Sequence, residues 1–104
     1  MACNLEFIEF VQTQLESLNL GTVLMRKMFG DYTIYINGIA VAVACDNYVY
    51  IKPHTAIDTL MSDAERGIPY PGAKERYILD VGHKTHTEQV LQTLLDVLPP
   101  PKTK

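Results

Sequence analysis

The chain has 104 residues, of which 47% are hydrophobic and 20% are charged, and its formal net charge at pH 7 is −3. This length fits one domain, and the composition is that of a folded globular protein, so a disordered chain is excluded. The negative charge gives no general attraction to phosphate backbones, so direct nucleic-acid binding would require a local basic patch.

The first residues and the cysteines predict the compartment. The chain enters an amphipathic pattern directly after Asn4, without the basic and apolar segments of a secretory signal, and no stretch reaches membrane-spanning length. Cys3 and Cys45 are too few for a disulfide scaffold and lack C-x-x-C spacing. We therefore expect a cytoplasmic protein with two reduced thiols and no membrane contact.

A first helix is predicted over residues 5–18, because apolar residues recur there at three- and four-residue steps. Asn4 can cap its first turn, and Gly21 can take the left-handed conformation that ends it. Phe7 and Phe10 widen the apolar stripe, which predicts burial on more than one side of this helix.

Residues 23–52 predict an antiparallel β-meander, because Val, Ile and Tyr are frequent and turn residues recur at regular intervals. The dipeptide Asn37-Gly38 is the strongest hairpin signal, since both central residues of a type I′ turn need positive φ, and Asp46-Asn47 is a weaker one. Two-residue turns at both places would pair Ile36 with Ile39 and Cys45 with Tyr48.

Strict alternation along these strands then assigns the side chains to two faces. The face with small alanines would admit a helix and form the core, and it carries Thr33, Tyr35, Ala40, Ala42, Ala44, Val49 and Ile51. The other face is too apolar for water, so helices or a second subunit would cover it. It carries Tyr32, Ile34, Ile36, Ile39, Val41, Val43, Tyr48 and Tyr50.

The second half of the chain predicts a short helix, a strand and a last helix. The short helix would span residues 55–66, with Thr55 and Asp58 as a capping box and Gly67 after its end. Its buried side would consist of Ile57, Leu60 and Met61. Residues 68–74 predict irregular structure and residues 77–81 a strand.

The last helix would run from Thr87, as its N-cap, to Leu98. Its buried side chains would be Val90, Leu91, Leu94, Leu95 and Leu98. Three prolines stop it, so we predict a single domain over residues 1–98 and a Pro/Lys tail over residues 99–104.

No residue pattern predicts catalysis, a cofactor or a metal. His83 and His86 are close in sequence, but no Cys, Asp or Glu at ligand spacing accompanies them, and His54 has no nucleophile motif beside it. We therefore predict a non-enzyme with no catalytic residue, cofactor or metal site. An enzyme would need a pocket that joins these histidines to Asp58 or Asp80.

Three short motifs, in the correct order, resemble the N-terminal domain of the TfoX/Sxy competence regulators. They are Met28-Phe29-Gly30-Asp31-Tyr32 with Tyr35 and Asn37-Gly38, then Asp46-Asn47-Tyr48-Val49-Tyr50-Ile51-Lys52, and then Tyr70-Pro71-Gly72. With the flanking helices, the similarity covers nearly the whole chain. The matching residues are scaffold residues, since Gly30 permits a bend, Gly38 makes a hairpin and Pro71-Gly72 a turn.

The resemblance implies an α+β domain with an antiparallel meander and flanking helices in the order α-β-β-β-α-β-α, similar to secretion-chaperone-like folds, which are often homodimers. It also implies regulation of DNA-uptake competence genes, as a transcriptional co-activator with a cyclic-AMP receptor type activator. The chain has no counterpart of the family's C-terminal domain, so we expect a stand-alone domain.

We therefore predict a non-catalytic, homodimeric regulatory domain that acts through protein–protein contacts. The expected contact residues are Arg26, Lys27, Tyr32, Tyr48, Tyr50 and Lys52. The same basic and aromatic side chains leave nucleic-acid binding open as an alternative, because bases can stack on tyrosines.

Overall fold

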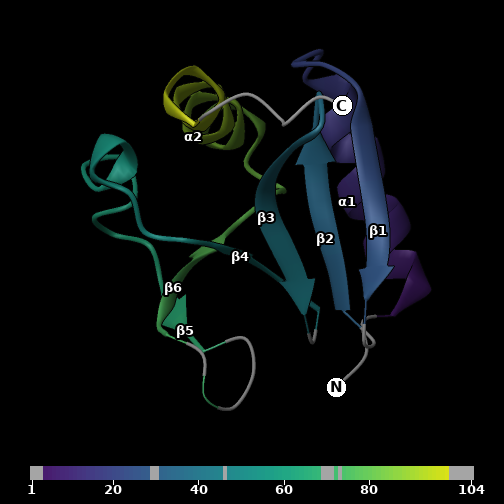
Figure 1. Cartoon of the computed structure of the whole chain (residues 1–104), viewed down its shortest axis with the longest axis horizontal. Coiled ribbons are helices and arrows are strands. Elements are labelled where there is room, and N and C mark those ends of the chain that lie inside the picture. The colour runs from purple at the N-terminus through teal and green to yellow at the C-terminus, as the bar shows by residue number, and fades with distance from the viewer. Residues whose placement is uncertain (1–3, 29–30, 46, 69–71, 73, 99–104) are drawn as a thin grey trace, which may run out of the picture.

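An antiparallel sheet with helices packed on one of its faces forms the protein (Figure 1). The computed structural model describes residues 4–28, 31–45, 47–68, 72 and 74–98. In these residues the elements are α1 (Leu5–Ser17), β1 (Val23–Met28), β2 (Asp31–Ile36), β3 (Ile39–Cys45), β4 (Tyr48–Ile51), the 3-10 helix η1 (Thr55–Ile57), β5 (Arg66–Gly67), β6 (Arg76–Leu79) and α2 (Lys84–Val97). The expected α+β class, with a meander between flanking helices, is confirmed.

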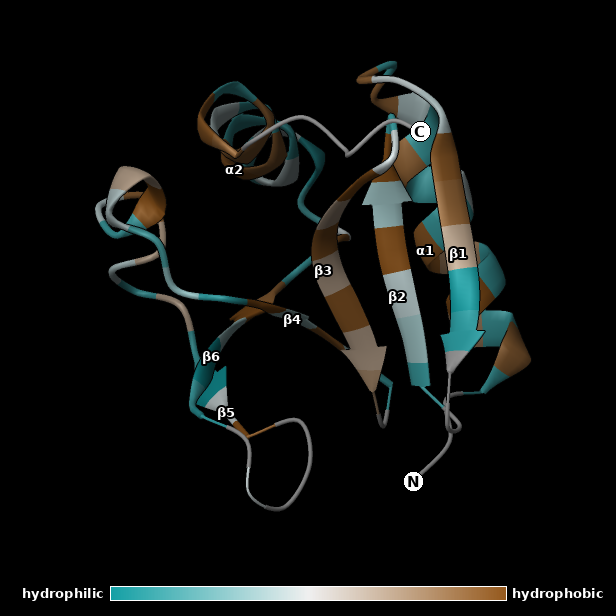
Figure 2. Ribbon diagram, viewed as in Figure 1, coloured by the Kyte–Doolittle hydropathy of each residue, from teal (hydrophilic) through white to brown (hydrophobic). Residues whose placement is uncertain are grey.

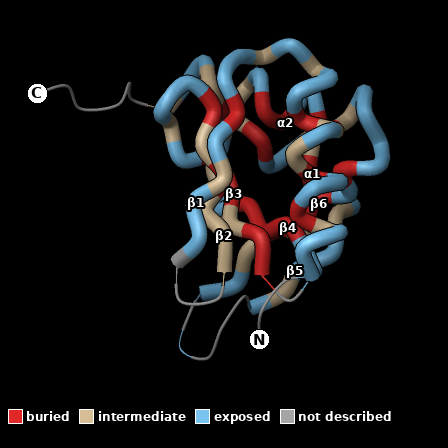
Figure 3. The backbone as a smooth tube through the Cα atoms, turned by 90° about the vertical axis from the view of Figure 1, so that its right-hand side faces the viewer, coloured by how far each residue is buried: buried red, intermediate tan, exposed pale blue. Residues whose placement is uncertain are grey.

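The described strands form one six-stranded sheet in the order β1-β2-β3-β4-β6-β5, and every neighbouring pair is antiparallel. The sheet twists, so that β4 crosses the direction of β1 and β2 in Figure 1. Buried residues gather between the strands and the two α-helices, as Figure 3 shows. None of the described helices is long and apolar enough to cross a membrane.

Helix α1 matches the expected pattern at its start and differs at its end. The side-chain oxygen of Asn4 accepts a hydrogen bond of 2.8 Å from the Glu6 amide, which confirms the predicted cap. The helix ends at Ser17, and Asn19, at φ +56°, takes the left-handed conformation that had been expected at Gly21. Asparagine tolerates this conformation better than other residues with a side chain, so it can replace the glycine.

Both predicted hairpins keep their register. Asn37 and Gly38 have φ of +54° and +81°, as a type I′ turn requires. The pairs Ile36 with Ile39 and Cys45 with Tyr48 are confirmed.

A β-bulge in β3 overturns the expected division of the two sheet faces. Tyr35 pairs with Ala40, but Ile34 pairs with Ala42, so Val41 is an extra residue on β3. One extra residue inverts the alternation of every side chain beyond it. The covered face therefore combines members of both expected sets, namely Ile34, Ile36, Ala42, Ala44, Val49 and Ile51.

The segment after β4 differs most from expectation. The 3-10 helix spans only Thr55–Ile57 and turns follow to residue 63, whereas an α-helix was predicted over residues 55–66. The cap is also different, because Nδ1 of His54 accepts the Ala56 amide at 3.0 Å. Asp, Thr and Ser residues in this segment compete with the helical backbone for hydrogen bonds, which favours turns. The expected buried residues are confirmed for Ile57 and Met61, and Leu60 is partly buried.

Helix α2 begins earlier than predicted. His83 is the N-cap, and its Nδ1 accepts the His86 amide at 3.2 Å. Thr87, expected as the cap, is buried inside the helix, and its hydroxyl donates to the Asp80 carbonyl at 3.1 Å. The predicted buried residues Val90, Leu91 and Leu94 are confirmed, and Leu95 and Leu98 are partly buried.

Several expected features lie outside the described residues. They are Cys3, Phe29, Gly30, Asp46, Tyr70, Pro71 and the tail over residues 99–104. Met28 ends β1, and Gly72 has φ +88°, as a turn glycine requires.

Candidate functional site

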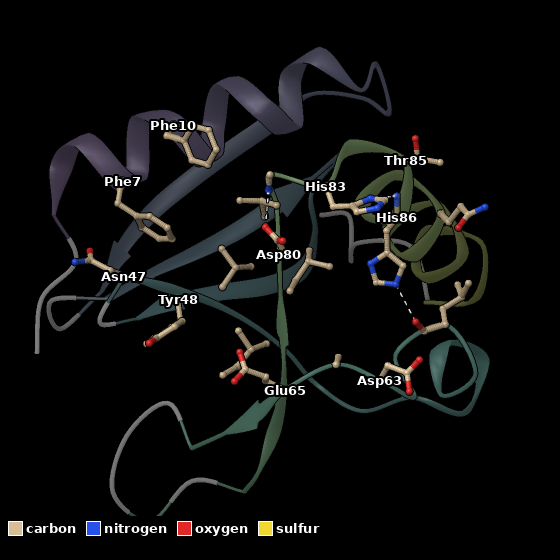
Figure 4. Close-up of a pocket in the computed structure, with 18 residues that line it drawn as sticks. Phe7, Phe10, Asn47, Tyr48, Asp63, Glu65, Asp80, His83, Thr85 and His86 are labelled. Carbon is tan, nitrogen blue, oxygen red and sulfur yellow. Dashed lines mark hydrogen bonds between the residues drawn. The ribbon is translucent and has the colours of Figure 1, made fainter.

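A groove of about 820 Å³ opens between α1, the segment that follows η1 and the start of α2 (Figure 4). Its floor is apolar, because the paired residues Val49 and Leu79 lie there with Val81, all of them buried. Phe7 and Phe10 of α1 line one wall, and the Phe10 side chain is 46% exposed. The predicted burial of the wider apolar stripe of α1 therefore holds in part for Phe7, which packs against the core, and is wrong for Phe10, which lines a groove.

Two histidines stand at the α2 end of this groove. Nε2 of His86 lies 2.8 Å from the Leu60 carbonyl oxygen, so this imidazole ties α2 to the segment after η1. His83 caps α2, and the centres of the two rings are 5.9 Å apart and almost perpendicular. Each imidazole therefore has a structural role.

The groove brings Asp80 together with His83 and His86, the proximity that an enzyme would need. It does not include His54, and Asp58 instead accepts a 2.7 Å hydrogen bond from the Tyr77 hydroxyl. No Ser, Cys or Lys nucleophile is among the described residues that line the groove. No group of three His, Cys, Asp or Glu side chains in the described ranges could hold a metal.

Carboxylates dominate the charge of the groove. Asp63, Glu65 and Asp80 line it, whereas the described lining contains no lysine or arginine. Asp80 uses Oδ1 to accept the Gly82 amide at 3.1 Å. The arrangement suits a ligand with positive charge and an apolar part.

The expected contact residues lie on two different faces of the sheet. Arg26 pairs with Thr33, and Tyr50 pairs with Val43, which places these side chains on the face away from the helices. Lys27 pairs with Tyr32, and Tyr32 packs against the core from the helix side. Arg26 and Lys27 therefore do not form one basic surface.

The tyrosines of β4 differ in exposure. Tyr48 is 49% exposed and lines the groove, whereas Tyr50 is 6% exposed, and their rings meet edge to face with centroids 6.2 Å apart. Gly67 permits this burial, because a Cβ there would lie 3.2 Å from Cε1 of Tyr50. Lys52 is exposed just after β4.

The sheet face away from the helices is open over β1, β2 and β3. We call this surface the outer face and define it by the side chains of Leu24, Arg26, Asp31, Thr33, Tyr35, Ala40 and Val43. It faces the viewer in Figure 1, where α1 lies behind these strands. Figure 2 shows that β1 changes from hydrophobic to hydrophilic at Arg26. Leu24 is 55% exposed there, so its side chain adds apolar surface to this face.

A hydrogen bond and a cation–π contact hold β6 to its neighbours. The Tyr77 hydroxyl donates to Asp58, and the guanidinium of Arg66 lies 4.8 Å from the Tyr77 ring centroid. The hydrogen bond to Asp58, together with burial, raises the pKa of Tyr77 above its ordinary value of 10.0.

Comparison with known proteins identifies a relative. No protein-family model matches the chain. A protein of Spirochaeta aurantia, described as an uncharacterized 12.7 kDa protein in the trpE 5′ region, is 33% identical over 84 residues, which span 79% of this chain and 73% of the spirochaete protein. The chain belongs to the family of this protein.

The family relationship supports one shared fold, and the description of the spirochaete protein names no ligand or activity. The site residues therefore rest on geometry. Among them, the Phe7 and Phe10 stripe had a signal in the sequence. Tyr48, as an expected contact residue, and Asp80, His83 and His86, as a possible pocket, were also singled out there. Asp63 and Glu65 had none, because nothing in their local pattern distinguishes them from solvated surface carboxylates.

Proposed function

We propose that this protein is a non-catalytic, cytoplasmic regulatory domain of the TfoX N-terminal kind, which acts through protein–protein contacts. The observation that carries the proposal is the outer face, an apolar sheet surface on which no described helix packs. A monomer seldom leaves such a surface in water, and apolar patches of this kind mark protein contacts.

The partner that best fits the outer face is a second copy of the chain. Arg26 and Asp31 are the charged residues among those that define this face, and their charges are opposite, so two copies could meet there with little net charge repulsion. Interfaces of homodimers are more apolar than ordinary surface. A two-fold axis would pack the outer face of one copy against the outer face of the other.

Light scattering on the wild type and on two leucine variants tests this dimer. Leu24→Glu puts a carboxylate on the outer face, and Leu5→Glu is the matched control, because Leu5 is 66% exposed on α1 and lies away from that face. We expect a dimer for the wild type and for Leu5→Glu, and a folded monomer for Leu24→Glu. A monomeric wild type, or equal masses for the two variants, contradicts the proposal.

The TfoX resemblance supports a transcription activator of the cyclic-AMP receptor type as the further partner, with competence genes as the target. The purified activator should bind the wild-type dimer, and binding that cannot be measured at micromolar concentration argues against this partner. Nucleic-acid binding has weaker support, because Arg26 and Lys27 point to opposite faces and the net charge is −3.

A further inference from the structure

We propose that the groove beside α1 binds a small organic cation that has an apolar, preferably aromatic, body. This site is separate from the outer face, because the groove opens on the side of the sheet that carries the helices. Its volume of about 820 Å³ lies within the range of small-molecule sites, roughly 300–1,000 Å³.

The apolar half of the groove would hold the body of the ligand. Phe7 and Phe10 form its wall, and Val49 and Leu79 form its floor (Figure 4). A ligand that covered the exposed part of the Phe10 ring would remove apolar surface from water on both partners.

The carboxylates select the charge of the ligand. The side-chain carboxylates of Asp63 and Glu65 have no hydrogen-bond or ion-pair partner among the described residues, so their charges remain available to a ligand. Since the described lining has three carboxylates and no lysine or arginine, its charged side chains favour a cation over an anion. A cation between these carboxylates and the aromatic wall would gain both ion pairing and a cation–π contact.

The geometry favours an organic cation over a metal ion. Hard cations require several oxygen ligands at short distance, and no group of three potential ligands is close enough among the described residues. A primary ammonium group needs no such cage, because it can donate its N–H groups to one or two carboxylate oxygens. The apolar floor adds binding energy that a bare ion cannot use.

Titrations monitored by ¹H–¹⁵N NMR test the site with three probes that share one ring. They are 2-phenylethylammonium, the neutral 2-phenylethanol and the anionic phenylacetate. We expect saturable shifts of the amides of α1, of residues 60–65 and of residues 80–86 with the cation, at least about fivefold weaker binding of the alcohol, and no binding of the anion.

Glu65→Gln should weaken the cation about threefold and leave the alcohol unchanged, because it removes one charge. Phe10→Ser should weaken both probes. The matched controls are Glu9→Gln and Leu5→Ser, which change exposed side chains of α1 that do not line the groove. All four positions are exposed, so the variants should fold.

The proposal is overturned if the cation gives no saturable shifts at concentrations up to about 10 mM, where binding would be only about −2.7 kcal/mol. It is also overturned if the three probes bind equally, if the shifts map to the outer face, or if Glu65→Gln binds the cation as the wild type does. None of these results depends on the proposed dimer, because the same titration can be run on Leu24→Glu.

Discussion

The bulge in β3 makes a sharp prediction about two alanines of the same strand. Strict alternation would place Ala40 and Ala44 on one face, whereas the structure exposes Ala40 on the outer face and buries Ala44 completely, at 0% exposure. Ala44 pairs with Tyr32 and Val49, and both partners contribute to the core side. Replacing each alanine by leucine therefore tests which side chains of β3 point to the core beyond Val41.

Ala44→Leu adds three carbons to a filled core, and such overpacking costs about 1–3 kcal/mol. Ala40→Leu adds the same carbons to an exposed position and should change the free energy of unfolding by no more than about 0.5 kcal/mol. For a domain of this size, a loss of about 2 kcal/mol lowers Tm by roughly 10 °C.

Urea and thermal unfolding followed by circular dichroism measure both effects. The two substitutions are made in the Leu24→Glu background, so that a contact at the outer face cannot add to the stability of Ala40→Leu. Equal losses for the two variants, or a larger loss for Ala40→Leu, would refute the bulge and restore strict alternation.

Two other predictions concern hydrogen bonds. The pKa of Tyr77 is higher in the folded than in the unfolded state, so its contribution to stability is complete below about pH 10 and is lost as the pH rises through the raised value. The free energy of unfolding, measured against pH, should therefore fall less steeply above about pH 10 in Tyr77→Phe than in the wild type. An unchanged slope would exclude Tyr77 as the source of the loss. Asn4→Ala removes the cap of α1 and should cost about 1 kcal/mol, measured by urea unfolding, whereas Asn4→Asp should cost much less; equal losses would mean that the cap does not stabilise the helix.

The local elements were largely predictable from the sequence. Helix α1 follows from apolar residues at helical spacing and a cap at Asn4, and the hairpin at Asn37-Gly38 follows from the need for positive φ. These features depend on neighbours within a few residues, so the local pattern contains the information that decides them.

The structure of the segment after β4 could not be predicted from its sequence. The spacing of Ile57, Leu60 and Met61 fits a helical turn, and it fits an irregular segment that buries the same side chains equally well. Whether the helix or the irregular segment forms depends on the hydrogen bonds that the segment makes with the rest of the protein. Here His54 caps η1, and His86, from α2, bonds to the Leu60 carbonyl. That second contact links residues far apart in the sequence, so no local pattern predicts it.

Length, composition and periodicity alone predicted the α+β class, the meander and the amphipathic helices that became α1 and α2, although they also predicted an α-helix over residues 55–66 that does not form. The tertiary structure decided which sheet face is covered, because one extra residue at Val41 inverts the alternation without any signal in the sequence. It also decided the groove, since Phe10 of α1, Glu65 before β5, Asp80 after β6 and His86 of α2 come together only when the sheet twists and packs against α1 and α2. Such a site depends on how elements that are far apart in the sequence pack together, and local sequence patterns do not predict that packing.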